Sequence, residues 1–153
     1  MTRIIKAVFV SAALVGGGLV ASAQAADTSY DAALKDVEQS WGFVPTFMKE
    51  MPKAGFAGAW QQLKDLEFSD QTALDAKTKE LIALAVVSQI PCAYCIWADA
   101  AGAKQAGATD EQIKEAVAIA ATERYWSTML NGLQIDLAGF KAELGPVFGA
   151  AAK

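Results

Sequence analysis

The stretch that decides the fold is AKTKELIALAVVSQIPCAYCIWADAAGAKQAG, residues 76–107. Its first part, residues 76–89, has the spacing of a helix, and beyond Glu80 its side chains are apolar on every side. A helix without a polar face is typical of a central helix that its neighbours cover. Pro91 interrupts this pattern, and a second helix is predicted over residues 92–106. The segment therefore predicts two successive helices, with two cysteines where the second begins.

The rest of the chain predicts helices on both sides of this pair. Thr109 and Gln112 have the spacing of a capping box, which marks the start of a long helix. Further helical patterns cover residues 31–39, 54–66, 110–130 and 135–144, with a short helix after Pro45. No stretch alternates as a strand does. We therefore predict an all-α fold, a single domain of about six to seven helices.

The N-terminus predicts export. Arg3 and Lys6 precede an apolar run over residues 7–20, and small residues then lead to Ala23-Gln24-Ala25. This is the layout of a cleaved secretory signal. An uncleaved membrane anchor is disfavoured because the apolar run is shorter than the ~20 residues that span a bilayer. Cleavage is predicted after the last alanine of this motif, with the alanine two residues earlier as the alternative, and it would place the protein in the periplasm.

Removal of the signal, residues 1–25, leaves residues 26–153 as one domain with a net charge of −6. Proteins that bind nucleic acid or anionic membranes carry clustered lysine and arginine. No such cluster is present in this sequence. We therefore expect neither nucleic acid nor a membrane among the partners of the mature protein.

The two cysteines, Cys92 and Cys95, are the most distinctive chemical feature of the sequence. With no histidine in the chain, the usual ligands of a zinc site are missing, and no metal or other cofactor is expected. A purely structural disulfide is one interpretation, but closing so short a loop stabilises a protein by only ~2 kcal/mol. At the start of a helix, backbone N–H groups and the helix dipole favour a thiolate. Redox activity is therefore the favoured interpretation, and the structural bridge stays open as the alternative.

Two acidic residues are candidates for proton transfer beside the cysteines. Asp99 shares one helix face with both cysteines, four residues after the second. Glu80 lies on an apolar stripe of the preceding helix, where burial would raise its pKa and suit it to act as a general acid or base. The alternatives are an ordinary ion pair of Glu80 with Lys77 or Lys79, and a solvated surface position for Asp99.

With these elements in place, residues 74–122 resemble the carboxymuconolactone decarboxylase superfamily, in its alkylhydroperoxidase D-like branch. The likeness consists of Glu80, the cysteine pair that begins twelve residues later, and the helix pattern that ends in Gly107-Ala108-Thr109-Asp110-Glu111-Gln112. Upstream, Gly42-Phe43-Val44-Pro45 is similar to the family's lead-in. Downstream, the stretch around Trp126-Ser127-Thr128 resembles an exported subgroup.

The resemblance implies an all-helical fold assembled as a homo-oligomer, a trimer or hexamer, and thiol-dependent reduction of hydroperoxides. It implies that Cys95 is attacked by peroxide and that Cys92 resolves the product into a disulfide. The helix dipole alone would instead favour Cys92 as the more acidic thiol. The implied partners are a small hydroperoxide or disulfide substrate and a thiol reductant that the sequence does not identify.

The sequence departs from this pattern at its histidines. The family's relay histidine is replaced by Asp99, and other positions that carry histidine in some members are Tyr94 and Tyr125. No imidazole is left to transfer protons near neutral pH, so we predict a peroxidase weaker than its relatives. Two alternatives remain: a non-enzymatic oligomeric binding protein with a structural disulfide, and a decarboxylase-type enzyme that uses Glu80 as its base.

Overall fold

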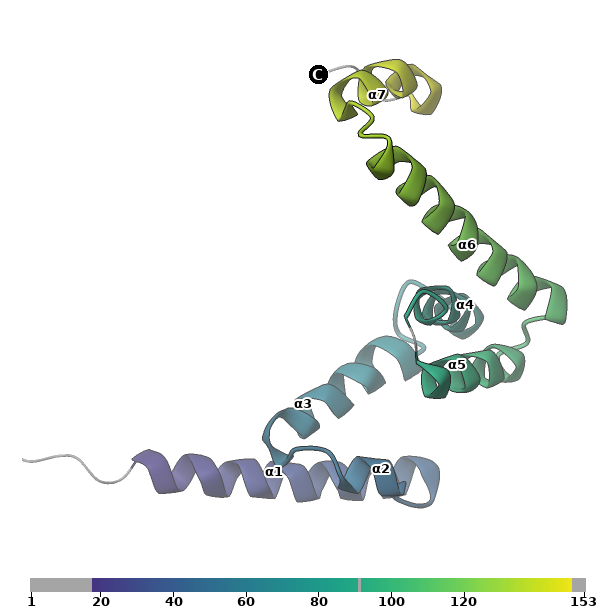
Figure 1. Cartoon of the computed structure of the whole chain (residues 1–153). Coiled ribbons are helices and arrows are strands. Elements are labelled where there is room, and N and C mark those ends of the chain that lie inside the picture. Colours follow the sequence, from purple (N-terminus) through teal and green to yellow (C-terminus); the bar gives the residue numbers. More distant parts are fainter. Residues whose placement is uncertain (1–17, 91, 150–153) are drawn as a thin grey trace, which may run out of the picture. The chain divides into compact units, whose positions relative to one another are not determined.

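The computed structural model describes residues 18–90 and 92–149, and over these residues the chain is helical, with no strand (Figure 1). The α-helices are α1 (Gly18–Trp41), α2 (Thr46–Lys49), α3 (Lys53–Leu63), α4 (Ala76–Val87), α5 (Ala93–Gln105), α6 (Asp110–Gly132) and α7 (Leu137–Leu144). A π-helical turn, η1 (Lys64–Phe68), follows α3, and a 3-10 turn, η2 (Gly145–Phe148), follows α7. These elements confirm the predicted all-α fold of six to seven helices.

Two compact units make up the chain, one ending at Asp65 and one beginning at Leu66. Most of the predicted signal segment and the predicted break at Pro91 lie outside the described residues. The helix expected over residues 31–39 begins earlier, at Gly18. It therefore includes the predicted cleavage site after Ala25, and the start of the helix is no test of whether the signal is cleaved.

The first unit is held together by apolar contacts of α1 with α2 and α3. Its core consists of Tyr30, Ala33, Val37, Met48, Phe56 and Trp60. The indole N–H of Trp60 donates a hydrogen bond to the Asp36 carboxylate at 2.6 Å, and Lys64 pairs with the same carboxylate at 2.5 Å. The predicted helix over residues 54–66 is shorter and irregular, because Gly55 adopts a φ of +89° and the helix gives way to η1 after Leu63.

The second unit is built on α4, which packs against both α5 and α6. The buried side chains Leu84, Ala103 and Ala120 come one from each of these helices. The predicted capping box of Thr109 and Gln112 is confirmed, since each side chain bonds the other's backbone N–H. α4 thus has the predicted central position between α5 and α6. The predicted cover is incomplete within this chain, because Ile82 and Val86 are about half exposed.

The C-terminal part of the second unit exposes apolar side chains. α6 continues to Gly132 as one helix, and α7 follows after Asp136, whose carboxylate accepts hydrogen bonds from two backbone N–H groups. Large exposed apolar residues in this region are Leu133, Ile135, Leu137, Val147 and Phe148. Within the described residues, no helix combines the length and the hydropathy needed to cross a bilayer.

Candidate functional site

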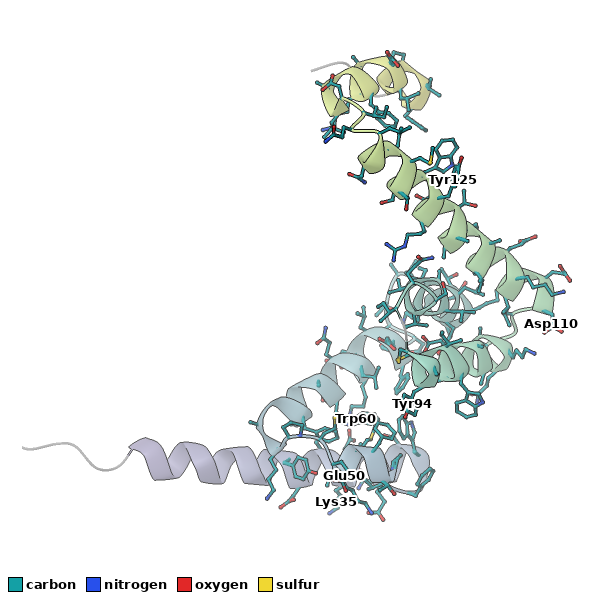
Figure 2. The ribbon with its side chains drawn as sticks, in the orientation of Figure 1. Lys35, Glu50, Trp60, Tyr94, Asp110 and Tyr125 are labelled. Carbon is teal, nitrogen blue, oxygen red and sulfur yellow. A yellow bond between two sulfur atoms is a disulfide. The ribbon has the colours of Figure 1, made fainter. Side chains whose placement is uncertain are left out.

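Cys92 and Cys95 form a disulfide at the N-terminus of α5, with their Cα atoms 5.4 Å apart. Cys92 is the N-cap residue, and its Sγ accepts a hydrogen bond from the backbone N–H of Cys95 at 3.2 Å. The predicted position of the pair at a helix start is therefore confirmed. Both cysteines are half-buried, whereas Tyr94 between them is 89 % exposed. Figure 2 labels Tyr94.

A pocket of about 630 Å³ opens beside Cys95 in the second unit. Most of its wall is apolar, from Leu66, Ala73, Leu74, Ile82, Ala83, Val86 and Val87, and Thr72 adds a hydroxyl group. Its charged lining residues are Glu67, Lys79 and Asp99. Cys95 is the member of the disulfide that lines this pocket. Of the two cysteines, the second is therefore the one beside the place where a small organic molecule would sit.

Glu80 lies on α4 with its carboxyl group against the backbone of α5. A Cβ atom added to Gly102 would lie 2.6 Å from the Glu80 Cδ atom, so glycine leaves the space that this carboxyl group fills. The expected alternative of an ion pair is wrong, because Glu80 pairs with neither Lys77 nor Lys79 in the described chain. Lys79 instead donates a hydrogen bond to the Ser69 carbonyl at 2.6 Å.

The electrostatic surroundings of Glu80 favour its protonated form. Burial is the main cause that raises the pKa of Glu80, and the nearby carboxylates of Asp99 and Glu67 raise it further. This direction agrees with the prediction that the apolar stripe would raise the pKa. A carboxyl group of this kind can hold or release a proton closer to neutral pH than an exposed glutamate can.

Asp99 lies at the wall of the pocket, half-buried, rather than at a fully solvated surface position. Burial raises the pKa of this carboxyl group as well. The structure thus brings Cys95 and Asp99 to one pocket, as their shared helix face predicts. It also places Asp99 close enough to Glu80 to act on its ionisation.

Glu67 is a site residue that the sequence pattern does not predict. It lies in η1, lines the pocket, and has a pKa raised first by burial and then by Asp99, with Lys79 acting in the opposite direction. No helical spacing connects Glu67 with the cysteines, because the π-helical turn and a loop separate it from α4. The signal that could have found it is its acidic side chain at the end of an apolar helix pattern.

The aromatic residues fall into two groups. Trp60 is a core residue of the first unit. Trp97, Tyr125 and Trp126 are each more than half exposed. None of these aromatics lines the pocket beside Cys95.

The arrangement combines a disulfide at a helix start, an apolar pocket and carboxyl groups with raised pKa. Such a site can exchange its disulfide with thiols and can move protons to or from a bound molecule. No group of three or more acidic or cysteine side chains in the described parts of the chain has the geometry of a metal site.

Comparisons with known proteins agree with this geometry. The chain is 44% identical over 71 residues to uncharacterized protein 4 in the cox locus of Paracoccus denitrificans, covering 46% of this chain and 63% of that protein. The crystal structure of the alkylhydroperoxidase AhpD core from Rhodospirillum rubrum superposes with a TM-score of 0.62 at 26% identity, covering 76% of this chain and 88% of that one. Residues 54–136 match the carboxymuconolactone decarboxylase family. The chain therefore belongs to the carboxymuconolactone decarboxylase family, in its alkylhydroperoxidase D-like branch.

Proposed function

We propose that this protein is a thiol-dependent oxidoreductase that reduces organic hydroperoxides through Cys92 and Cys95. The observation that carries the proposal is that Cys95 and Asp99 line one largely apolar pocket. The apolar wall suits the carbon skeleton of an organic hydroperoxide. The structural likeness to the AhpD core is consistent with this chemistry.

The reaction begins from the reduced pair. The Cys95 thiolate attacks the outer oxygen of the hydroperoxide, the O–O bond breaks, and the alkoxide leaves as an alcohol after taking up a proton. Cys95 is then a sulfenic acid, and the Cys92 thiol attacks its sulfur, forming the disulfide and releasing water. Two thiols of an external reductant regenerate the reduced pair by disulfide exchange, because the protein itself holds no further cysteine.

Carboxyl groups take the proton-transfer role in this scheme. Asp99, on the pocket wall, is the group that would exchange a proton with Cys95 or with the leaving oxygen. Glu80, whose pKa Asp99 raises, would exchange the proton onward. Carboxyl groups match the thiol pKa less well than imidazole does, so turnover is slower than in relatives that carry a histidine.

The test is the reduction potential of the pair, measured on the purified mature protein in thiol–disulfide buffers and followed by a hydroperoxide assay. A value within the range of exchange proteins, roughly −120 to −270 mV, together with hydroperoxide consumption, would support the proposal. A value below about −300 mV without consumption would instead indicate a structural bridge in a non-enzymatic protein. Activity on a lactone or carboxylate that survives replacement of both cysteines by alanine would indicate the decarboxylase-type alternative.

Export is part of the proposal and rests on the sequence of the N-terminus. The layout up to Ala25 is that of a cleaved signal. Expression of the full chain and intact-mass analysis of the periplasmic fraction test it. A mature protein that begins at Ala26 supports export, and an unprocessed chain in the cytoplasm contradicts it.

A homo-oligomer, a trimer or hexamer, is the assembly we propose. The large exposed apolar side chains of α6, α7 and η2, among them Trp126, Leu137 and Phe148, are the surface that such an assembly would cover. Light scattering coupled to size-exclusion chromatography would give the mass of the assembly. A monomer at micromolar concentration would exclude it.

A further inference from the structure

We propose that Glu67 makes the pocket selective for uncharged hydroperoxides, so that hydroperoxides bearing a carboxylate are reduced slowly. This inference rests on the proposed peroxide-reducing function and specifies its substrate class. It concerns the electrostatics of the pocket rather than the cysteines themselves.

The wall of the pocket carries more acidic than basic side chains. Among the lining residues, Glu67 and Asp99 are acidic and Lys79 is basic. Glu80 lies close enough to both acids for their charges to act on its ionisation. Three acidic groups therefore oppose one lysine, and the field inside the pocket is negative when they are ionised.

The ammonium group of Lys79 already has interaction partners within the protein. Its ammonium group donates a hydrogen bond to the Ser69 carbonyl at 2.6 Å, and it acts electrostatically on Glu67. A substrate carboxylate would have to displace both interactions to pair with this lysine. Among the described residues that line the pocket, Lys79 is the only cation. The acidic side chains therefore repel an anionic substrate, and no lysine of the pocket wall is available to form an ion pair with it.

Glu67 lies outside the two helices that carry the proposed reaction. It comes from η1, outside the α4–α5 helix pair that carries Glu80, Asp99 and the cysteines. Its carboxylate therefore adds to the charge of the pocket from outside the helix pair that carries the reacting sulfur atoms. Glu67 is itself exposed to solvent, so water weakens the effect of its charge, but a bound substrate would displace water from the apolar wall beside it and so strengthen the repulsion.

The preference for uncharged substrates should depend on pH. The charged groups that act on one another here are Glu67, Lys79, Glu80 and Asp99. Because the pKa values of the three acids are raised, their negative charge develops above the ordinary range for carboxyl groups. Discrimination against a carboxylate substrate should therefore increase as the pH rises through this window.

The experiment compares two substrates that differ in one charge. These are the hydroperoxide of 4-isopropylbenzoic acid and that of its methyl ester, assayed with the full mature protein and an excess of a small dithiol. We expect kcat/KM to be about tenfold or more higher for the ester. Glu67→Gln should reduce this ratio at least threefold, and because the ratio compares two substrates on one protein, any effect of the variant on proton transfer at Glu80 cancels from it. Glu115→Gln, an exposed acid on α6, removes the same charge elsewhere and should leave the ratio unchanged.

A second measurement does not depend on any variant. Added sodium chloride screens charge repulsion, so the ratio for the wild-type protein should fall as salt increases. Equal kcat/KM for the two substrates at low salt would overturn the inference while leaving peroxide reduction in place. Reduction of neither substrate would overturn the proposed function, and the inference with it.

Discussion

The carboxyl group of Glu80 on α4 occupies the space that a side chain at Gly102 of α5 would fill. The absence of a side chain at Gly102 allows the two helices to hold the Glu80 carboxyl group between them. Gly102 follows Cys95 by seven residues on α5. The position of Glu80 is thus determined by a residue on the neighbouring helix as well as by its own.

Gly102→Ala tests this relationship. The added methyl group would displace the Glu80 carboxyl group toward solvent, so we expect its pKa to fall toward the ordinary glutamate value. Alanine improves helix propensity by up to about 1 kcal/mol, and the displaced group is the end of a flexible side chain, so the melting temperature should change little. Carboxyl titration by ¹³C NMR would measure the pKa, and hydroperoxide consumption should decrease in parallel.

Gly58→Ala is the matched control for this variant, because nothing lies within 4 Å of a Cβ atom at that helical glycine. It should leave both the Glu80 titration and the activity as they are. An unchanged Glu80 pKa in the Gly102 variant would contradict the role assigned to the glycine.

Replacing Glu80 by glutamine tests the effect of its raised pKa on stability. An acid whose pKa is higher in the folded than in the unfolded state binds more protons when folded, so its ionisation destabilises the fold as the pH rises. For Glu80 this loss begins near the ordinary value of 4.5 and is complete above the raised folded-state pKa. At pH 7 to 8, Glu80→Gln should therefore be more stable than the wild-type protein. Its free energy of unfolding should also decline less between the ordinary and the raised pKa of Glu80.

Urea unfolding at several pH values would measure this difference. Glu115→Gln, at an exposed position of α6, should follow the wild-type curve. A Glu80→Gln protein less stable than wild type at pH 8 would show that the carboxylate stabilises the fold in its ionised form.

The two cysteines should differ in their single replacements. Cys95→Ser should abolish hydroperoxide reduction, because it removes the thiol of the cysteine that lines the pocket. Cys92→Ser should still allow one reaction at Cys95 and leave a sulfenic acid that dimedone traps and mass spectrometry detects. Loss of the disulfide should cost only about 2 kcal/mol in either variant. A sulfenic acid trapped at Cys92 in the Cys95→Ser protein would reverse the assigned roles.

Asp99→His would place an imidazole on the pocket wall. General acid–base catalysis by a suitable group contributes about 10²- to 10⁴-fold, and histidine titrates near neutral pH. We expect the variant to reduce hydroperoxides at least tenfold faster than wild type at pH 7. Asp110→His, on the exposed start of α6, is the control. A variant no faster than wild type would show that proton transfer does not limit the reaction.

Much of the fold could be predicted from local sequence patterns. The start of α6 was predictable because Thr109 and Gln112 form a capping box, and Gly107 ends the preceding helix with a φ of +86°. The kink at Gly55 and the change to a π-helical turn after Leu63 were not predictable, because their spacing is also compatible with a regular helix.

The site was predictable only where its residues lie on one helix. Cys92, Cys95 and Asp99 follow helical spacing, and their common position could be inferred from it. The contact of Glu80 with Gly102 depends on how α4 packs against α5, and the place of Glu67 depends on an irregular turn. Neither relationship has a periodic signal in the sequence.

The cap of α5 has a consequence for how a reductant reaches the disulfide. α4 and α6 begin with oxygen caps from Asp75 and Thr109, whereas α5 begins with the sulfur of Cys92, a weak acceptor. Apart from the disulfide itself, the first turn of α5 is therefore held less firmly than the other two. Once a first thiol has broken the disulfide, this turn should open locally and exchange its amide hydrogens faster than the other two, so a second thiol can reach the mixed disulfide while the rest of the unit stays folded.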